Sequence, residues 1–514
     1  MVDLLGGNPT ISLASLVDSD LSVRFLDTTL RDGEQAPGVS LSPDEKAEIA
    51  LALDRAGVDL IEAGSAVTGA GERETIKRVT GLDLDARVTS FARGVEGDID
   101  LALDCDVDGV TIVVPSSDRH IEQKVGTTRE QVRETTVSLV EYAKDHGLWT
   151  EVIGEDGSRA ELSFLSALMG DALRAGADRG CFADTVGHAS PEQTYAYVSA
   201  LAELGPVSTH THDDLGLGVM NAMMSIAAGA DLVHGTINGI GERAGNVAIE
   251  EVAIALAHCY DLETIDLTEV YQLAQVVSAA TGIALAPNKA VIGENAFTHE
   301  SGIHTDGTLK DERMYEPYPP ERVGRERRLV LGKHAGRAGV RAALLEHGMT
   351  VGPTALDTVV ERVKALGDRG KRVSDADLLT IAEEVLGQER DRYVELLDLT
   401  AASGGSTPTA AVRLRVGDDE RLASGTGSGP VDAAINAVRA ALGQDAAAQL
   451  DSYHVDAITG GTDAVVTVEV QMSRGDTTVT VAQSDSDITR CSVAAMVEAL
   501  DRLWARNPPI PVDD

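Results

Sequence analysis

Two histidines separated by one residue are the first sign of chemistry in this chain. His210 and His212 end a run of β-branched and polar residues that begins at Val207. Side chains alternate across a β-strand, so both imidazoles should project from the same face. Asp213 and Asp214 follow directly, and imidazoles with carboxylates are ligands for a divalent cation. A His-x-His pair also occurs at ordinary polar strand ends, so the metal interpretation depends on what the fold places beside it.

The composition limits the class of protein. With 514 residues, 43% of them hydrophobic, the chain is long enough for roughly two to four domains with sizeable cores. The net charge of -40 is spread along the whole chain, which argues against a nucleic-acid partner because the phosphates would be repelled. Lysine is scarce among the basic residues. This acidic composition predicts a halophilic protein, because concentrated salt screens the repulsion among its carboxylates.

Cysteine usage and the N-terminal sequence indicate a cellular compartment. The 4 cysteines are widely separated and form no Cys-x-x-Cys pair, so we expect no disulfide framework or zinc ribbon and predict that all of them are small buried residues. The N-terminus has no basic segment followed by an apolar run, and no stretch approaches the length of a membrane span. We therefore expect a cytoplasmic protein with no membrane partner.

An alternation of strand-like and helix-like segments begins at residue 23 and ends near residue 260. The strand-like runs are residues 23–26, 60–63, 88–91, 110–114, 150–153, 180–183, 207–210 and 232–237. Helical patterns lie between them, and the one over residues 42–53 opens with Ser42, Pro43 and Glu45, a capping box with proline at the first position. Eight such units predict an α/β fold, the (β/α)8 TIM barrel. An open doubly wound sheet is the alternative, but no Gly-x-Gly-x-x-Gly follows the first strand.

Polar residues suited to catalysis follow the ends of several predicted strands. They are Arg31 and Asp32, Glu155 and Asp156, Asp184 and Thr185, His210 and His212, and Asn238 with residues 242–246. In a TIM barrel the carboxyl ends of all strands meet on one rim, where the active site lies. These residues should therefore be close in space, which strengthens the metal interpretation.

The remaining sequence suggests further domains. We expect residues 1–20 to form an N-terminal extension, 21–283 the barrel, 284–395 helical linker subdomains, and 396–514 a C-terminal α+β domain with a linker at 401–406. Strand 410–416, a Gly-rich turn at 425–429 and helix 431–442 are weakly repeated by strand 477–481 and helix 488–503. The last domain contains no catalytic cluster, which predicts a regulatory or assembly role.

Several motifs resemble the signatures of the 2-isopropylmalate, citramalate and homocitrate synthase family. They are residues 27–35, 210–214, 238–246, 301–307 and 331–337, and residues 427–433 with 459–464 look like the family's C-terminal allosteric domain. The resemblance covers nearly the whole chain. It implies an acyltransferase that carries out a metal-dependent Claisen condensation of acetyl-CoA with a 2-oxo acid, followed by hydrolysis of the thioester.

The same resemblance implies the metal ligands. They would be Asp32, His210, His212 and Asn246. Mixed oxygen and nitrogen donors suit Mg²⁺ or Mn²⁺, and two histidines also allow Zn²⁺. A 2-oxo acid offers adjacent carboxylate and ketone oxygens that chelate such an ion, which makes the ketone a stronger electrophile.

Substrate contacts and catalytic residues follow from the resemblance as well. Arg31 would stabilise the ketone oxygen as it becomes an alkoxide, with Gln35 and Thr185 as further substrate contacts. Glu155 and His304 resemble the pair assigned to the proton transfers, and the sequence does not decide which of them removes the first proton.

Asp306 and Tyr315 resemble residues that orient the catalytic pair. Because His304 lies beyond the barrel, the resemblance implies a domain-exchanged homodimer in which it serves the neighbouring subunit.

The choice of 2-oxo acid depends on the pocket. Residues 62–67 and 113–117 look more like archaeal-type citramalate synthases than isopropylmalate synthases. Ile153 lies two residues before Glu155 and should face the barrel interior, near Phe91. A pocket narrowed by these side chains would favour the methyl group of pyruvate, since each methylene is worth about 1 to 3 kcal/mol.

We therefore expect (R)-citramalate formation in isoleucine biosynthesis. Formation of 2-isopropylmalate from 2-oxoisovalerate, in leucine biosynthesis, is the alternative. The matching effectors would be isoleucine or leucine, although residues 483–486 lack the glycines usual in that turn of the effector domain. A metal-dependent aldolase or lyase is an alternative of another class. It would need a Schiff-base or carboxybiotin-handling lysine, where this chain has His304 and an effector-like domain.

Overall fold

The computed structural model describes residues 22–368, 373–386, 392–403, 407–443, 448–457, 466–475 and 477–506. The expected N-terminal extension, residues 1–20, and the motif at 459–464 lie outside the described residues. The chain divides into two compact units. The barrel unit comprises Met1–Phe297 and Tyr318–Arg327, and the second unit comprises Thr298–Pro317 and Arg328–Asp514.

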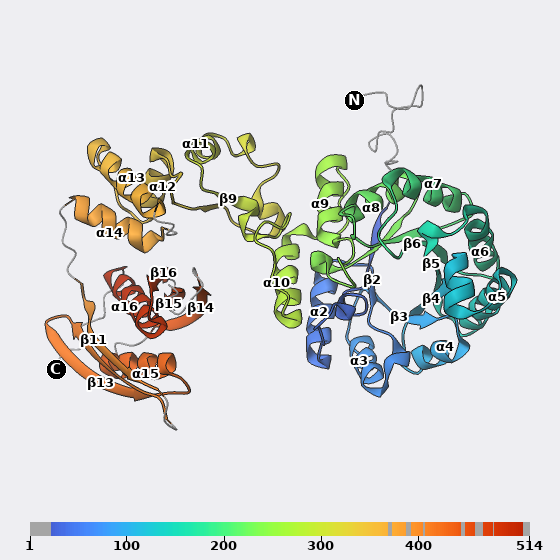
Figure 1. Cartoon of the computed structure of the whole chain (residues 1–514), viewed down its shortest axis with the longest axis horizontal. Coiled ribbons are helices and arrows are strands. Elements are labelled where there is room, and N and C mark those ends of the chain that lie inside the picture. Colours follow the sequence, from blue (N-terminus) through green and yellow to red (C-terminus); the bar gives the residue numbers. More distant parts are fainter. Residues whose placement is uncertain are drawn as a thin grey trace. The chain divides into compact units, whose positions relative to one another are not determined.

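Eight parallel strands close into a barrel in sequence order, which confirms the predicted TIM barrel (Figure 1). The ring is closed by β1 and β8, where Phe25 pairs with Val233. Each strand lies where a β-branched or apolar run predicted one. The strands are β1 (Arg24–Asp27), β2 (Leu60–Glu62), β3 (Arg87–Arg93), β4 (Gly109–Pro115), β5 (Trp149–Glu155), β6 (Arg179–Asp184), β7 (Val207–Thr211) and β8 (Leu232–Gly235).

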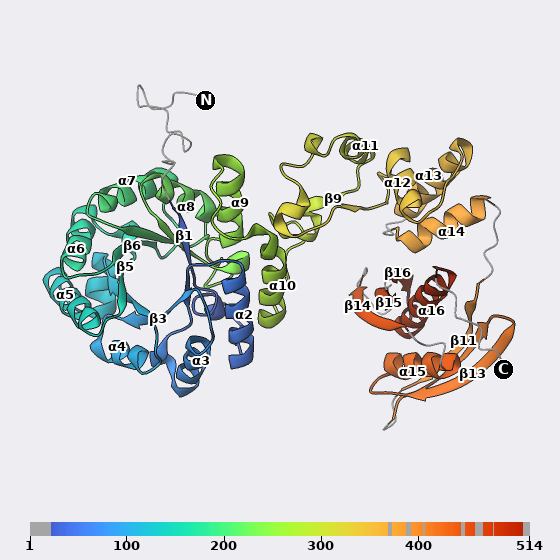
Figure 2. The ribbon, with the colours of Figure 1, turned by 180° about the vertical axis from the view of Figure 1, so that it is seen from behind.

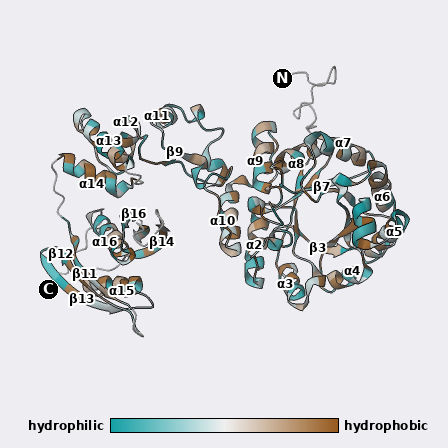
Figure 3. Cartoon of the chain, in the orientation of Figure 1, coloured by the Kyte–Doolittle hydropathy of each residue, from teal (hydrophilic) through white to brown (hydrophobic). Residues whose placement is uncertain are grey.

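Helices form the outer ring of the barrel unit (Figure 2). They are α2 (Pro43–Arg55), α3 (Ala70–Thr80), α4 (Glu96–Leu103), α5 (Arg129–Asp145), α6 (Leu162–Arg174), α7 (Pro191–Ala202), α8 (Gly218–Ala227), α9 (Ile249–Tyr260) and α10 (Val270–Thr281). The predicted capping box opens α2, since the Ser42 side chain accepts from the Glu45 amide and the Glu45 side chain accepts from the Ser42 amide. Polar and apolar stretches alternate along these helices in Figure 3, because one face of each packs on the strands.

The four cysteines differ in burial. Cys105 and Cys181 are buried in the barrel unit and Cys491 in the second unit, but Cys259 is exposed. The prediction that all four are buried is therefore wrong. Cys259 lies in the last turn of α9, where the neighbouring His258 is exposed as well. No helix in the described part of the chain is both long and apolar enough to cross a membrane.

The second unit has three parts. β9 (Thr298–His299) pairs with β10 (Arg328–Leu329), close in sequence to α11 (Gly302–Lys310). The helices α12 (Arg337–Glu346), α13 (Pro353–Gly367) and α14 (Asp375–Leu386) share an apolar core. Two antiparallel sheets then follow, each with one helix. They are β11 (Val394–Ala402), β12 (Thr409–Val416) and β13 (Asp419–Thr426) with α15 (Pro430–Leu442), and β14 (Gln449–Ala457), β15 (Val466–Arg474) and β16 (Thr477–Asp485) with α16 (Ile488–Arg506).

Two details of the C-terminal prediction are wrong. The expected linker at 401–406 begins inside β11, where Ala401 pairs with Ala410. Residues 404–406 lie outside the described part of the chain. Gln483 lies in β16 opposite Val468, within a strand and not in a turn. Both segments are rich in small or polar residues. Such residues occur in exposed strands as well as in loops, so the composition does not distinguish the two.

Candidate metal centre and active site

The segment after β1 is fixed by buried hydrogen bonds. The Asp27 carboxylate accepts from the backbone amide and the hydroxyl of Thr29, both at 2.8 Å. The same hydroxyl accepts from the Ile237 amide at 2.9 Å, which ties this segment to the loop after β8. Complete burial raises the pKa of Asp27 to about 7.

This raised pKa gives a testable pH dependence. Between about pH 4 and pH 7 the native Asp27 holds a proton that the unfolded chain has lost, so the free energy of unfolding should fall as the pH rises and level off above 7. Asp27→Asn cannot titrate. The free energy of unfolding of the wild type minus that of the variant should therefore fall by roughly 1 to 4 kcal/mol from pH 5 to pH 8 in urea titrations. A difference that stays constant with pH would contradict this reading.

A fully buried lysine holds the turn that carries the motif residues. The Lys46 ammonium lies 2.7 Å from Glu34 Oε2 and 2.9 Å from Glu72 Oε1. Glu34 also accepts from the Leu41 amide at 2.9 Å. Because a buried lysine is stable only when its charge is compensated, these contacts fix α2, α3 and the loop after β1 against one another.

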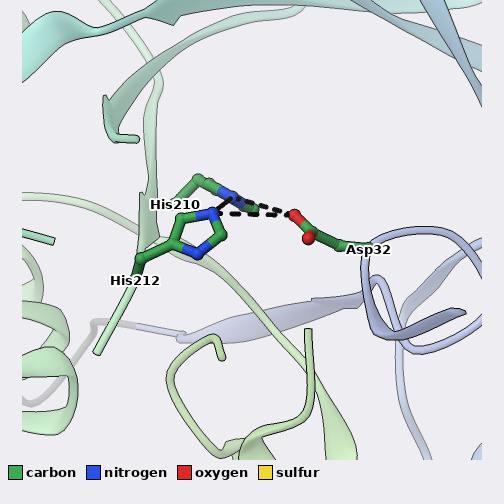
Figure 4. A group of neighbouring side chains, drawn as sticks. All are labelled: Asp32, His210 and His212. Carbon is green, nitrogen blue, oxygen red and sulfur yellow. Dashed lines mark hydrogen bonds and ion pairs between the residues drawn. The ribbon is translucent and has the colours of Figure 1, made fainter. Parts of the chain in front are cut away.

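Three of the predicted ligands converge at the carboxyl end of the barrel (Figure 4). Asp32 Oδ2 lies 3.4 Å from His210 Nε2 and 3.8 Å from His212 Nε2, and the two Nε2 atoms lie 3.2 Å apart. All three residues are buried. They come from the loop after β1 and from β7 with the residue that follows it, so the closed barrel brings them together.

Asn246 lies beside this cluster. It forms an isolated β-bridge with His212. A Cβ atom on Gly241 would lie 2.3 Å from Asn246 Nδ2 and 3.4 Å from Asp32 Oδ1, at a φ of +150°, so only glycine fits between these two side chains. Asn246 Nδ2 donates to the Ile240 carbonyl at 3.3 Å, which leaves the amide oxygen as the free ligand atom.

The donor set fits a divalent cation. Asp32 Oδ1 and Asn246 Oδ1 are buried without a hydrogen-bond partner in the described structure, a costly state unless a ligand satisfies them. Burial lowers the pKa of His210, and that of His212 to about 4, so both imidazoles are neutral and able to ligate a metal. Burial alone would raise the pKa of Asp32, but the charge of Arg31 and a hydrogen bond with His210 hold it below its usual value.

Arg31 is held on three sides. Its Nη1 donates to Asp32 Oδ2 at 2.9 Å, its Nε donates to Glu62, and its Cζ lies 4.8 Å from the centre of the Phe91 ring. Glu62 is fully buried and also accepts from the Thr111 hydroxyl. Glu62 and Thr111 were not predicted as supports of the site. Glu62 could have been found from the sequence, because it is a carboxylate in an otherwise apolar run. A buried charge of this kind must have a partner.

The other predicted barrel residues have contacts of their own. Thr185 Oγ1 accepts from the Asp156 amide at 2.8 Å, which leaves its proton free to donate to a ligand. Ile153 is buried against Cys181 and Ala183. Glu155 ends β5, and Gln35 is exposed at the end of the 3-10 turn Gly33–Gln35.

The three predicted residues beyond the barrel belong to the second unit. The rings of His304 and Tyr315 stack with their centroids 4.3 Å apart. Asp306 Oδ2 lies 2.6 Å from the ammonium of Lys310, one turn further along α11. The structure therefore groups His304 with Tyr315, while Asp306 pairs with Lys310.

A second group of ligand-type side chains lies deeper in the barrel. Glu151, Cys181 and His234 are buried together, and Glu151 Oε2 lies 3.0 Å from His234 Nε2. Burial would raise the pKa of Glu151, but His234 and Arg179 outweigh that effect and keep the carboxylate charged. Burial also raises the pKa of Cys181 well above its usual value, so it stays a thiol. We interpret this group as a charge-compensated part of the barrel core.

Comparisons with known proteins cover the whole of this architecture. Residues 22–277 match a family model described as HMGL-like, residues 291–371 one described as homocitrate synthase post-HMGL domain-like, and residues 372–504 one described as LeuA allosteric (dimerisation) domain.

Full-length relatives agree with these matches. The putative (R)-citramalate synthase CimA of Methanothermobacter thermautotrophicus is 51% identical over 490 residues, which is 95% of this chain and 99% of that protein. The putative (R)-citramalate synthase CimA of Methanosphaerula palustris is 49% identical, covering 94% of this chain and 97% of that protein. The (R)-citramalate synthase CimA of Methanocaldococcus jannaschii is 47% identical, covering 94% of this chain and 100% of that protein. The chain therefore belongs to the (R)-citramalate synthase family.

Proposed function

We propose that the protein condenses acetyl-CoA with pyruvate to give (R)-citramalate and CoA. The observation that carries this proposal is the convergence of Asp32, His210 and His212 beside Asn246, with Arg31 held against the same carboxylate. Relatives that carry the name (R)-citramalate synthase match nearly the whole chain, which favours pyruvate over 2-oxoisovalerate.

Bound by these four residues, a divalent cation would polarise the ketone of the 2-oxo acid. The oxygen and nitrogen donors suit Mg²⁺ or Mn²⁺, and the two histidines accommodate Zn²⁺. The chain contributes neutral imidazoles and an ionised carboxylate, so the centre needs no proton release from these groups before a metal binds.

Arg31 is the group that would stabilise the developing alkoxide. Its Nε and Nη1 are engaged by Glu62 and Asp32, so the guanidinium is fixed before substrate arrives. Its Nη2 is used in neither of these bonds and would donate to the ketone oxygen. A donor fixed in advance stabilises a transition state without reorganisation.

Glu155 and His304 would move the protons. One of them takes a methyl proton from acetyl-CoA, the resulting enolate carbon attacks the ketone carbon of pyruvate, and water then cleaves the thioester and releases the CoA thiol. Tyr315, stacked on His304, and Asp306 would orient this group, and Thr185 would hold the pyruvate carboxylate. His304 would serve the barrel of a neighbouring subunit in a homodimer.

Feedback control belongs to the same proposal. The LeuA allosteric (dimerisation) match over residues 372–504 supports assembly through the C-terminal domain. Isoleucine would be the effector of this domain in the synthesis of isoleucine.

Supplying acetyl-CoA with pyruvate, 2-oxoisovalerate or 2-oxoglutarate in turn tests the proposed function. Release of free CoA thiol should depend on pyruvate and on an added divalent cation, with citramalate identified by mass spectrometry. If thiol were released with 2-oxoisovalerate but not with pyruvate, the substrate would be 2-oxoisovalerate. If none of the three acids caused release, the proposal of a synthase would be wrong.

Ile153 provides a test of substrate size. Ile153→Ser removes a buried branched side chain that packs on Cys181 and Ala183, so kcat/KM for 2-oxoisovalerate relative to pyruvate should rise by about tenfold or more. Ile153→Val, which keeps most of the volume, should leave that ratio within about threefold of the wild type. If Ile153→Ser left the ratio of the two kcat/KM values unchanged, the Ile153 side chain would not select the substrate.

A further inference from the structure

A segment of π-helix lies against the end of β5. It runs from Arg119 to Val125 after β4. Such segments are rare and are frequently found at functional sites. Arg129 fixes its start by two bonds to the Asp118 carboxylate, at 2.6 and 2.8 Å. Its end is marked by Gly126 in the left-handed region at a φ of +73°.

Two side chains of this segment contact the proposed catalytic carboxylate. His120 Nδ1 lies 3.1 Å from Glu155 Oε2, and the Lys124 ammonium lies 2.5 Å from Glu155 Oε1. The two contacts differ in exposure, since the His120 side chain is 17% exposed and that of Lys124 is 55% exposed. His120 therefore holds Glu155 from the protein side, and Lys124 holds it from the solvent side.

The imidazole of His120 lies between two carboxylates. Its Nε2 lies 3.6 Å from Asp156 Oδ2, and Asp156 is fully buried, where it accepts from the Ser117 hydroxyl at 2.5 Å and from Arg159 Nε at 2.6 Å. The His120 amide donates to the Ser117 hydroxyl at 3.2 Å. The backbone of His120 is thus bonded to the segment after β4, and its ring lies between the carboxylates of Glu155 and Asp156.

We propose that His120 is a positioning residue that keeps the Glu155 carboxylate turned into the barrel mouth, where it meets acetyl-CoA or water. This inference rests on the proposed function, which gives Glu155 its role in proton transfer. Without His120, the only remaining contact from the π-helical segment is the exposed Lys124. The carboxylate would then follow that ammonium toward solvent, away from the atoms with which it exchanges protons.

The test is a double-mutant cycle in the full chain loaded with a divalent cation. Thiol release from acetyl-CoA and pyruvate is measured for wild type, His120→Leu, Glu155→Gln and the double variant. In the wild-type background, His120→Leu should lower kcat by about 30-fold or more, with KM for pyruvate within about threefold. In the Glu155→Gln background the same change should have no further effect, because His120 acts through Glu155.

Two further variants separate positioning from folding. His120→Asn keeps a side-chain N–H near the Nδ1 position and should stay within about threefold of the wild-type kcat. Gln123→Ala, at an exposed position of the same π-helical segment, is the matched control and should also stay within about threefold. Thermal melting of each variant checks the fold. If His120→Leu does not fold, the kcat of His120→Asn tests the inference in its place.

The inference is overturned if His120→Leu turns over at the wild-type rate. It is also overturned if His120→Leu lowers the rate equally in the Glu155→Gln background, or if His120→Asn is as slow as His120→Leu. Failure of the proposed function looks different. In that case the wild type releases no thiol with pyruvate, or Glu155→Gln keeps the full rate, and the assignment to Glu155 falls together with the inference.

Discussion

His212→Ala is expected to lower kcat for citramalate formation by on the order of a thousandfold, because a lost ligand removes several kcal/mol of charge stabilisation at the ketone. The Nε2 of His212 lies 3.2 Å from that of His210 and 3.8 Å from Asp32 Oδ2, so the three ligand atoms are close enough to share one ion. The fold should persist, since His212 directly follows β7 at the rim of the barrel.

Metal content gives a readout that does not depend on turnover. Isothermal titration with Mn²⁺ should show weaker binding to His212→Ala than to the wild type, with an unchanged thermal midpoint in buffer without metal. His188→Ala is the matched control, since His188 is 41% exposed and its Nδ1 lies 3.8 Å from Asp184. Wild-type turnover by His212→Ala would rule out the metal centre described here.

Arg31→Met is expected to affect both stability and activity. Glu62 is fully buried and pairs with Arg31 Nε, so removing the guanidinium leaves an uncompensated buried carboxylate. The free energy of unfolding should fall by about 3 to 5 kcal/mol. Turnover should fall by about a hundredfold or more, because the donor to the developing alkoxide is also lost.

A second substitution separates these two effects of Arg31. Glu62→Gln in the Arg31→Met background removes the unpaired charge and should restore most of the lost stability in urea titrations. Activity should remain low, because the amide does not replace the guanidinium. If activity returned together with stability, Arg31 would act only through the fold.

The barrel could be predicted because its strands are buried on both faces. Continuous β-branched runs such as the one that forms β4 (Gly109–Pro115) stand out between helical patterns. In the second unit β9, β10, β11, β13, β14 and β15 were not predicted. Sheets that expose one face carry polar residues at alternate positions, as in β13, where exposed and half-buried residues alternate. Such strands resemble loops in composition.

The metal cluster could be predicted because the active site of a TIM barrel lies at the carboxyl ends of its strands, and the sequence shows where each strand ends. Asp32, His210 and His212 all follow or end strands, and the closed barrel brings them within reach of one ion. The supports of the site could not be found in this way. Glu62, at the end of β2, meets Arg31 in the loop after the neighbouring strand β1, and His120 reaches Glu155 only because a π-helical segment follows β4. Neither pairing leaves a fixed spacing in the sequence.

The unequal burial of the four cysteines offers an experimental handle. Cys259 is exposed near the end of α9, while Cys105, Cys181 and Cys491 are buried. A maleimide dye applied to the native protein should therefore label Cys259 alone, on the barrel unit. With a second thiol introduced on the exposed surface of α11, energy transfer between two dyes would report the distance from the barrel to the helix that carries His304, and its change when pyruvate and acetyl-CoA bind.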